Sequence, residues 1–164
     1  MDGGGHAESG LTKSVWSDAD FDEMGWHDAT IHGLCVERTA DGLPRLLFDL
    51  DYIVRWVHPV APEVYFSFWV APATLAFDAV GDLGGDLDFK GMSPDLEVAD
   101  LHRLAPQDGW PDRPGWHVEG HAFELTFHAT GYRQYFRQVP RLVTRKALPH
   151  AERGGCSFAE VGFS

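Results

Sequence analysis

Apolar and polar side chains alternate with a period of two along most of residues 30–139. This period is typical of β-strands that bury one face. Gly and Pro residues interrupt the alternation at near-regular spacing, as they do at the turns of an antiparallel meander. The pattern predicts a mainly β protein, built as a single rolled antiparallel sheet or a partly open barrel.

The segments with the clearest alternation are the expected strands. They are residues 30–38, 45–57, 64–70, 74–80, 86–89, 116–120, 122–130 and 132–139. Residues 40–44, with Asp-Gly at their centre, predict a hairpin turn. Pro59 and Pro62 are expected to end the second strand, and Ala71-Pro72 to turn the chain. Residues 94–104 fit a strand or a helix, and the strands around them favour a strand.

The two ends of the chain lack this pattern. Ser17, followed by Asp18 and Asp20, predicts the start of one short N-terminal helix that reaches about Met24. The Gly-rich residues 1–13 are expected to form a disordered tail. We therefore expect one β domain over residues 14–150 and a C-terminal tail over residues 151–164.

The composition agrees with a globular protein of one domain. The chain has 164 residues, of which 44% are hydrophobic and 13% aromatic, enough for a core without disulfides. Its two cysteines show no zinc-site spacing, and a buried Cys35 with a free Cys156 is favoured over a disulfide. The N-terminus does not resemble a secretory signal, and no apolar run reaches the roughly 18 residues of a membrane span. These features predict a cytoplasmic protein, and the absence of Asn with ten Arg to three Lys predicts a high-GC, bacterial source.

The net charge of −12 is unevenly distributed. Residues 1–30 carry −6 and residues 31–130 carry −10, whereas residues 131–153 carry +5. An acidic body repels phosphate backbones, so nucleic acid is not an expected partner. The same charge would attract a basic protein, although acidity also serves solubility alone.

Histidines and a glutamate form one candidate metal site. His117, Glu119 and His121 share one face of a predicted strand, and His128 on the next strand could approach them. Histidine and carboxylate are common zinc ligands, but a flat strand separates its ends by too much for one ion unless a bulge at Gly120 brings His121 inward. The alternative interpretation is a polar outer face in contact with solvent.

Acidic side chains form a second candidate, a partner-binding surface. Its members are Asp49, Asp51, Asp82, Asp86 and Asp88. Paired carboxylates could also hold Ca²⁺ or share acid–base chemistry, but the segment 82–88 lacks the EF-hand pattern. Solvated charges that discourage edge pairing are the simpler explanation.

Two further motifs favour structural roles. His27-Asp28 with His32 could position a base, but no nucleophile motif accompanies them, and Trp26 and Asp28 are interpreted as anchoring a strand. Arginines and aromatic residues interleave over residues 132–146, a pattern that can bind single-stranded nucleic acid. No RNA-binding signature accompanies it, so pairing with acids of this chain or of a partner is favoured.

Several stretches together carry a family resemblance. They are Trp26-His27-Asp28 before a strand, residues 46–52 (LLFDLDY), residues 68–77 (FWVAPATLAF) and Trp116-His-Val-Glu119. As a set they resemble uncharacterised small bacterial β domains, some of them similar to immunity proteins of polymorphic toxin systems. The resemblance covers residues 26–140 and implies no catalytic residue.

The sequence therefore favours a non-enzymatic, acidic binding protein without a cofactor, and one such protein would be an immunity protein that neutralises a basic toxin. The alternative is a small metal-dependent hydrolase or ligand-binding β-barrel built on the histidine set. A third interpretation is a subunit of an assembly that uses exposed aromatic side chains. Oligomeric state and partner do not follow from the sequence.

Overall fold

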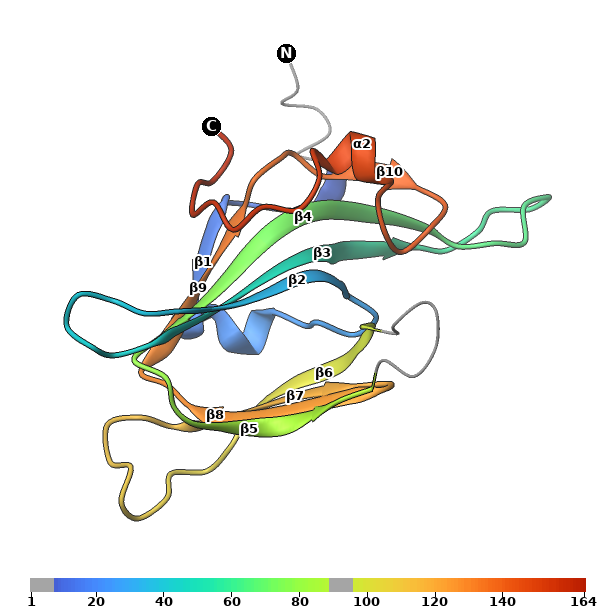
Figure 1. Cartoon of the computed structure of the whole chain (residues 1–164). Coiled ribbons are helices and arrows are strands. Elements are labelled where there is room, and N and C mark those ends of the chain that lie inside the picture. The colour runs from blue at the N-terminus through green and yellow to red at the C-terminus, as the bar shows by residue number, and fades with distance from the viewer. Residues whose placement is uncertain (1–7, 89–95) are drawn as a thin grey trace.

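Two antiparallel sheets stacked face to face form the protein (Figure 1). The computed structural model describes residues 8–88 and 96–164, which contain ten strands. The six-stranded sheet, here called sheet A, has the order β1 (Val15–Ser17), β9 (Gly131–Phe136), β4 (Ser67–Asp78), β3 (Arg45–Val57) and β2 (Thr30–Glu37), and β10 (Arg141–Val143) also pairs with β4. The four-stranded sheet, sheet B, has the order β5 (Gly81–Leu87), β8 (Phe123–His128), β7 (Gly115–Gly120) and β6 (Val98–Arg103).

The prediction of a mainly β, antiparallel fold is confirmed, but the prediction of a single sheet is wrong. The chain leaves sheet A after β4, where Ala79 takes a left-handed backbone conformation with φ 52°. It returns from sheet B after β8, where Thr130 N donates to Asp78 O at 3.1 Å. Alternation along a strand shows which face is buried but not which strands pair, so it could not reveal these two crossings. Among the described strands, both sheets are open and neither forms a closed barrel.

The prediction of one short N-terminal helix is not matched, because Asp18–Glu23 form a 3₁₀ helix, η1, in place of an α-helix. Ser17 caps it as expected, and the Asp20 side chain accepts from Ser17 N in return, at 3.0 Å. Four of its six residues are acidic, and its last turn has no basic residue to offset them. Such a segment favours a short helix held by its cap over a long one.

The turn expected at Ala71-Pro72 does not exist, because β4 continues straight through it. Pro72 lies opposite Asp51 of β3, at the point where the second neighbour of β4 changes. β10 pairs with Phe68–Val70, and β9 pairs with Ala73–Asp78. The missing N–H of the proline therefore falls between two ladders, where a strand tolerates it. The short strands β1 and β10 were not expected from the sequence.

Residues 94–104 contain the favoured strand, β6. Residues 89–95 lie outside the described part of the chain. The predicted end of the strand at residue 89 and the predicted start of the segment at residue 94 fall among them. The first strand was expected to end at Arg38 and ends at Glu37, and the second ends at Val57 as expected. The strand predicted over 132–139 ends at Phe136.

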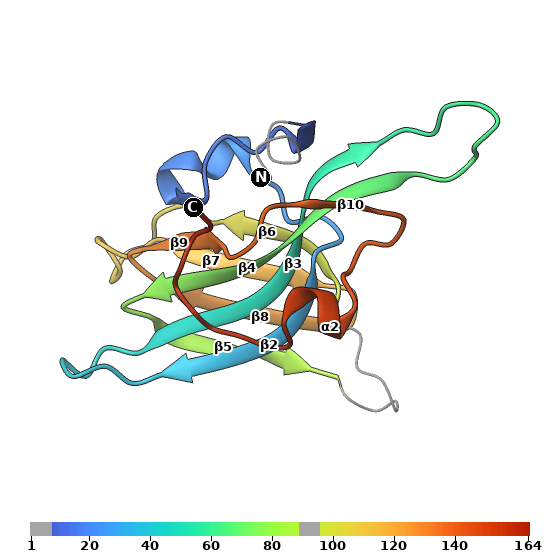
Figure 2. The ribbon, with the colours of Figure 1, turned by 90° about the horizontal axis from the view of Figure 1, so that it is seen from above.

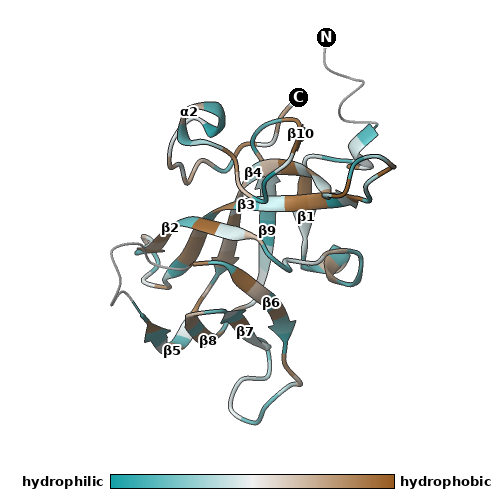
Figure 3. Cartoon of the chain, turned by 90° about the vertical axis from the view of Figure 1, so that its right-hand side faces the viewer, coloured by the Kyte–Doolittle hydropathy of each residue, from teal (hydrophilic) through white to brown (hydrophobic). Residues whose placement is uncertain are grey.

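The main core lies between the sheets and is built from buried apolar residues of both. Figure 3 shows hydrophobic positions along strands of both sheets. Trp116 of β7 is fully buried in this core, in edge contact with Phe77 of β4 and Tyr132 of β9. Leu11 belongs to this core as well, so the segment predicted as a disordered tail packs at its end, whereas residues 1–7 lie outside the described part.

The C-terminal segment covers the opposite, outer face of sheet A (Figure 2). It includes a single helical turn, α2 (His150–Arg153), and continues across β3 and β4. Arg153 is only 3% exposed, and Leu148 packs on Ile53, Phe68 and Val70 in a second small core. Residues 151–164 are therefore part of the packed structure and not the separate tail that the sequence suggested.

Candidate functional site

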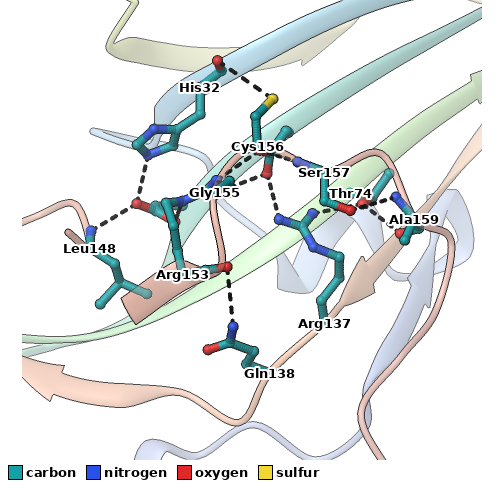
Figure 4. A network of polar contacts seen from close by, with 12 residues as sticks. His32, Thr74, Arg137, Gln138, Leu148, Arg153, Gly155, Cys156, Ser157 and Ala159 are labelled. Atoms are coloured by element: carbon teal, nitrogen blue, oxygen red, sulfur yellow. Dashed lines mark hydrogen bonds and ion pairs between the residues drawn. The ribbon is translucent and has the colours of Figure 1, made fainter. Parts of the chain in front are cut away.

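Two buried aspartates hold the C-terminal segment on sheet A (Figure 4). Asp49 accepts from both terminal nitrogens of Arg153 at 2.7 and 2.8 Å, from Arg137 at 2.7 Å and from Ser157 N at 2.9 Å. Asp51 accepts from Arg153 Nε at 3.2 Å and from Leu148 N at 2.8 Å, and it contacts His32 Nε2 at 2.8 Å. Neither carboxylate has any exposed area.

This arrangement removes Asp49 and Asp51 from the predicted partner-binding surface. Both lie on the outer face of β3, as alternation predicts, but the C-terminal segment covers that face and a partner cannot reach it. Two carboxylates buried side by side require cationic partners, because an unpaired buried charge costs several kcal/mol. Arg153 and Arg137 supply them from residues distant in sequence.

The charge environment sets the protonation of Asp49. Burial alone would raise its pKa, but the hydrogen bonds from Arg153 and Arg137 more than offset burial and lower the pKa from 3.8 to about 2. A carboxyl with a lowered pKa stabilises the fold above its unfolded-state pKa, and that contribution is lost as the pH falls through the folded-state pKa.

We therefore expect acid to weaken the fold between about pH 4 and pH 2. The Asp49 contribution is on the order of 2 kcal/mol, from the pKa difference of roughly two units. Chemical denaturation at a series of pH values measures it for the wild type and for Asp49→Asn, in which this contribution is absent. Glu37→Gln, a change at an exposed position, serves as the control. Its unfolding free energy should depend on pH as that of the wild type does. If the unfolding free energy of the wild type and of Asp49→Asn fell equally steeply between pH 4 and pH 2, the lowered pKa of Asp49 would be contradicted.

His32 and Cys156 lie next to this network but do not form a nucleophile pair. The Cys156 Sγ is 3.9 Å from the backbone oxygen of His32, not from its ring. Burial, and then the nearby Asp49 carboxylate, raises the pKa of the Cys156 thiol. A raised pKa keeps the thiol protonated at neutral pH, and the thiol is a poor nucleophile. The network is thus a structural clamp.

The outer face of sheet B carries a different arrangement, a row of four carboxylates. Asp86 of β5 lies opposite Glu124 of β8, Glu124 opposite Glu119 of β7, and Glu119 opposite Asp100 of β6. Directly opposite residues in antiparallel strands point to the same face with Cβ atoms about 5 Å apart. The four acids therefore form one line across the whole sheet, here called the acidic row.

Two histidines lie in the neighbouring row of the same face. His117 and His102 are opposite each other on β7 and β6, with ring centroids 5.4 Å apart. His117 Nε2 is 2.6 Å from Glu124 Oε1, and His102 Nε2 is 2.9 Å from Glu119 Oε1. The hydrogen bond from His102 lowers the pKa of Glu119, which stays ionised at neutral pH.

The predicted metal set is not brought together as one group. His117 and Glu119 share the outer face of sheet B, as expected, but each contacts a different partner. His128 lies under Trp110, with the rings stacked at 4.4 Å, and its Nδ1 is 3.0 Å from Arg113 O. His121 lies beyond the end of β7, near Asp28. The other predicted acids, Asp82 in the bulge of β5 and Asp88 after it, are exposed.

His121 belongs instead to a cluster with Asp28 and Glu97, in which one possible ligand atom of each lies within 4.8 Å of the others. Backbone pairing places them together, since His121 N donates to Glu97 O and Asp28 N to Val98 O. Lys146 Nζ occupies the cluster, 2.8 Å from Asp28 and 3.7 Å from Glu97.

The two carboxyls of this cluster differ in pKa. Burial, and then the hydrogen bond with Asp28, raises the pKa of Glu97. Burial opposes ionisation of Asp28 too, but the hydrogen bonds with Lys146 and Glu97 and the charges of Lys146 and His27 together outweigh burial and lower the pKa of Asp28. The ammonium group thus already neutralises much of the charge that a metal ion would meet.

A broad groove opens beside Lys146 on the outer face of sheet A. It has a volume of about 780 Å³, with Trp56, Tyr65, Phe66 and Phe68 of the β3–β4 hairpin on one side and residues 144–149 on the other. Trp56 links the groove to the cluster, because Lys146 Nζ lies 5.5 Å from the centre of its ring and His27 stacks on it at 6.1 Å. Volumes of this size are typical of ligand sites.

Comparison with known proteins identifies no relative, since no family model, curated protein or solved structure matches the chain. Within residues 8–88 and 96–164, no helix has the length and apolar character needed to cross a membrane.

Sequence reasoning missed Arg153, Glu97, Asp100, Glu124 and His102. For the basic stretch that contains Lys146 it favoured pairing with acids of this chain or of a partner, and Lys146 pairs with Asp28. One signal was available for Arg153, because residues 46–54 of β3 are apolar on both faces apart from the two aspartates, which need a cationic partner if that part of the strand is covered. The acidic row had no such signal. It depends on the register of four strands, and only the three-dimensional pairing reveals it.

Proposed function

We propose that this chain is a non-enzymatic binding protein, which uses the outer face of sheet B to bind a basic protein partner. The observation that carries the proposal is the acidic row, Asp86, Glu124, Glu119 and Asp100, which crosses all four strands. Like charges directly opposite each other destabilise a sheet. The two histidine contacts offset little of this cost, because even fully charged pairs near the surface contribute only about 0–1 kcal/mol each. Binding of a cationic surface would explain why the row is present.

The charge of the whole chain supports the same partner class. A net charge of −12 with a concentrated acidic face attracts a basic protein over distances longer than a direct contact. Such steering raises association rates by one or more orders of magnitude and weakens as salt screens it. A basic toxin, the partner class implied by the resemblance to immunity proteins, is one partner that meets these requirements.

A charge-reversal experiment tests this proposal. The probe is a lysine-rich peptide immobilised on a biosensor surface, with a glutamate-rich peptide of equal length as the reference. We expect Glu119→Lys/Glu124→Lys to lower the association rate for the lysine-rich peptide at least tenfold at low salt, because it reverses the middle of the acidic row. Raising the salt from about 20 to about 200 mM should remove most of this difference.

A variant with the same net charge separates the face from the overall charge. Glu63→Lys/Asp112→Lys changes two exposed acids that lie outside the acidic row, and it should lower the rate much less. Equal effects of the two double variants would show that net charge alone attracts the probe, and a rate unaffected by salt would also refute the proposal.

A further inference from the structure

The groove beside Lys146 has the composition of a protein-binding site of its own. Four aromatic side chains of the β3–β4 hairpin, Trp56, Tyr65, Phe66 and Phe68, form its apolar wall. Trp56 makes edge contacts with Phe66 at 6.0 Å and with Phe68 at 5.0 Å, so this wall is packed before any ligand arrives. Preorganised aromatic surfaces are the usual anchors of peptide and protein binding.

The opposite wall, residues 144–149, is also fixed in place. Leu148 is anchored by its backbone N–H to buried Asp51, and Lys146 by its ammonium group to Asp28. The groove is therefore bounded on both sides by elements held through buried or paired contacts.

Exposed apolar surface continues from the groove to the tip of the hairpin, which projects from the body of the protein (Figures 1 and 2). Val60, Val64 and Tyr65 are 79%, 72% and 80% exposed, and Phe66 at the groove is 38% exposed. Several exposed large apolar side chains on one hairpin mark an interaction site in a soluble protein. It extends beyond what a small molecule in the groove would cover, which favours a polypeptide as the occupant.

Basic side chains at the edge of the groove favour an acidic polypeptide. Arg145 is exposed and makes no ion pair within the described residues, and Lys146 lies beside it. Both belong to the basic stretch 131–153 of an otherwise acidic chain. Two other bases of that stretch, Arg137 and Arg153, are used by the buried aspartates, so Arg145 is left to meet an external carboxylate.

We propose that the groove binds an acidic polypeptide segment of another protein, with a large apolar side chain seated among Trp56, Tyr65 and Phe66 and a neighbouring carboxylate on Arg145. The site lies on the outer face of sheet A, opposite the acidic row on sheet B. The groove would bind an acidic partner, whereas the acidic row is proposed to bind a basic one. The groove therefore adds a second binding function to the one proposed above.

Selection of random peptides displayed on phage tests the inference with the full chain as target. Peptides are selected on the wild type and counter-selected on Tyr65→Ser/Arg145→Glu, whose two positions are exposed and do not support the fold. The expected peptides combine Asp or Glu with a nearby Trp, Phe or Leu. A synthetic peptide of that pattern should bind the wild type with a Kd at least tenfold lower than it binds Arg145→Glu.

Two control variants separate the possible outcomes. Val36→Ser, an exposed apolar position on β2, and Glu119→Lys/Glu124→Lys on sheet B should leave peptide affinity unchanged. Failure to enrich peptides, or enrichment of peptides without acidic residues, overturns the inference and leaves the acidic row untouched. Self-association in light scattering that Tyr65→Ser abolishes would instead assign the groove to a second copy of the chain, which also overturns it.

Discussion

Replacing Arg153 with Ala is expected to cost about 3–5 kcal/mol of unfolding free energy, the usual loss when one partner of a buried ion pair is removed. Arg153 makes three hydrogen bonds to Asp49 and Asp51, and its side chain is 1% exposed. Without it, Asp51 keeps His32 and Leu148 N, and Asp49 keeps Arg137 and Ser157 N, but two adjacent carboxylates share a single permanent cation.

Urea denaturation followed by Trp fluorescence measures this loss. Arg141→Ala is the matched control, because Arg141 is exposed and reaches Glu152 only at 3.9 Å, so less than about 0.5 kcal/mol is expected. A double-mutant cycle of Arg153→Ala with Asp49→Ala should give a coupling energy above about 1 kcal/mol. If Arg153→Ala cost no more than Arg141→Ala, the clamp would not contribute to stability.

Deleting residues 153–164 is expected to destabilise the protein more than Arg153→Ala does, by an amount comparable with the roughly 5–15 kcal/mol that stabilises a typical domain. The deletion removes Arg153 and several further attachments to sheet A. Three are hydrogen bonds from Ser157 N to Asp49, from Thr74 Oγ1 to Ala159 O and from Phe163 N to Phe136 O, at 2.9, 2.7 and 2.8 Å. Another is the ion pair of Glu160 with Arg45 of β3. It also exposes the outer face of β3 and β4 to water.

Differential scanning calorimetry checks this expectation, with deletion of residues 161–164 as the control that keeps the clamp. The longer deletion should lose its cooperative transition or melt far below the wild type, and the shorter one should melt only slightly lower. Loss of the transition could also reflect aggregation, so hydrogen exchange of β3 amides provides the second measurement. Wild-type protection of β3 in the longer deletion would show that the segment is dispensable.

Most of the longer strands were predictable because they carry their own period-two pattern and their own turn residues, which the three-residue strands β1 and β10 do not. β3 shows this best, since Leu46, Phe48, Leu50 and Tyr52 all enter the core between the sheets as alternation required. The division into two sheets was not predictable, because it depends on one left-handed residue, Ala79, and on contacts between strands far apart in sequence. Pro72 was misread for a related reason, namely that its neighbours in the sheet decide whether a proline can remain in a strand.

For the candidate sites too, local alternation was predictive, whereas contacts between distant segments were not. The face of His117 and Glu119 was predicted correctly from alternation, whereas the position of His121 depended on the pairing of residue 97 with the chain near Thr30. Asp49 and Asp51 were expected outside because acids usually are, and their arginine lies about a hundred positions later in the chain. Sequence reasoning could not pair them, since no local pattern connects them.

The separation of 104 residues between Asp49 and Arg153 has a consequence for synthesis of the protein. A ribosome that adds roughly 5–20 residues per second completes β3 about 5–20 s before it adds Arg153. Throughout that interval the nascent chain holds two carboxylates that cannot be desolvated, so the outer side of β3 must stay hydrated. The order of translation thus makes the arginine clamp a late event in the maturation of the fold.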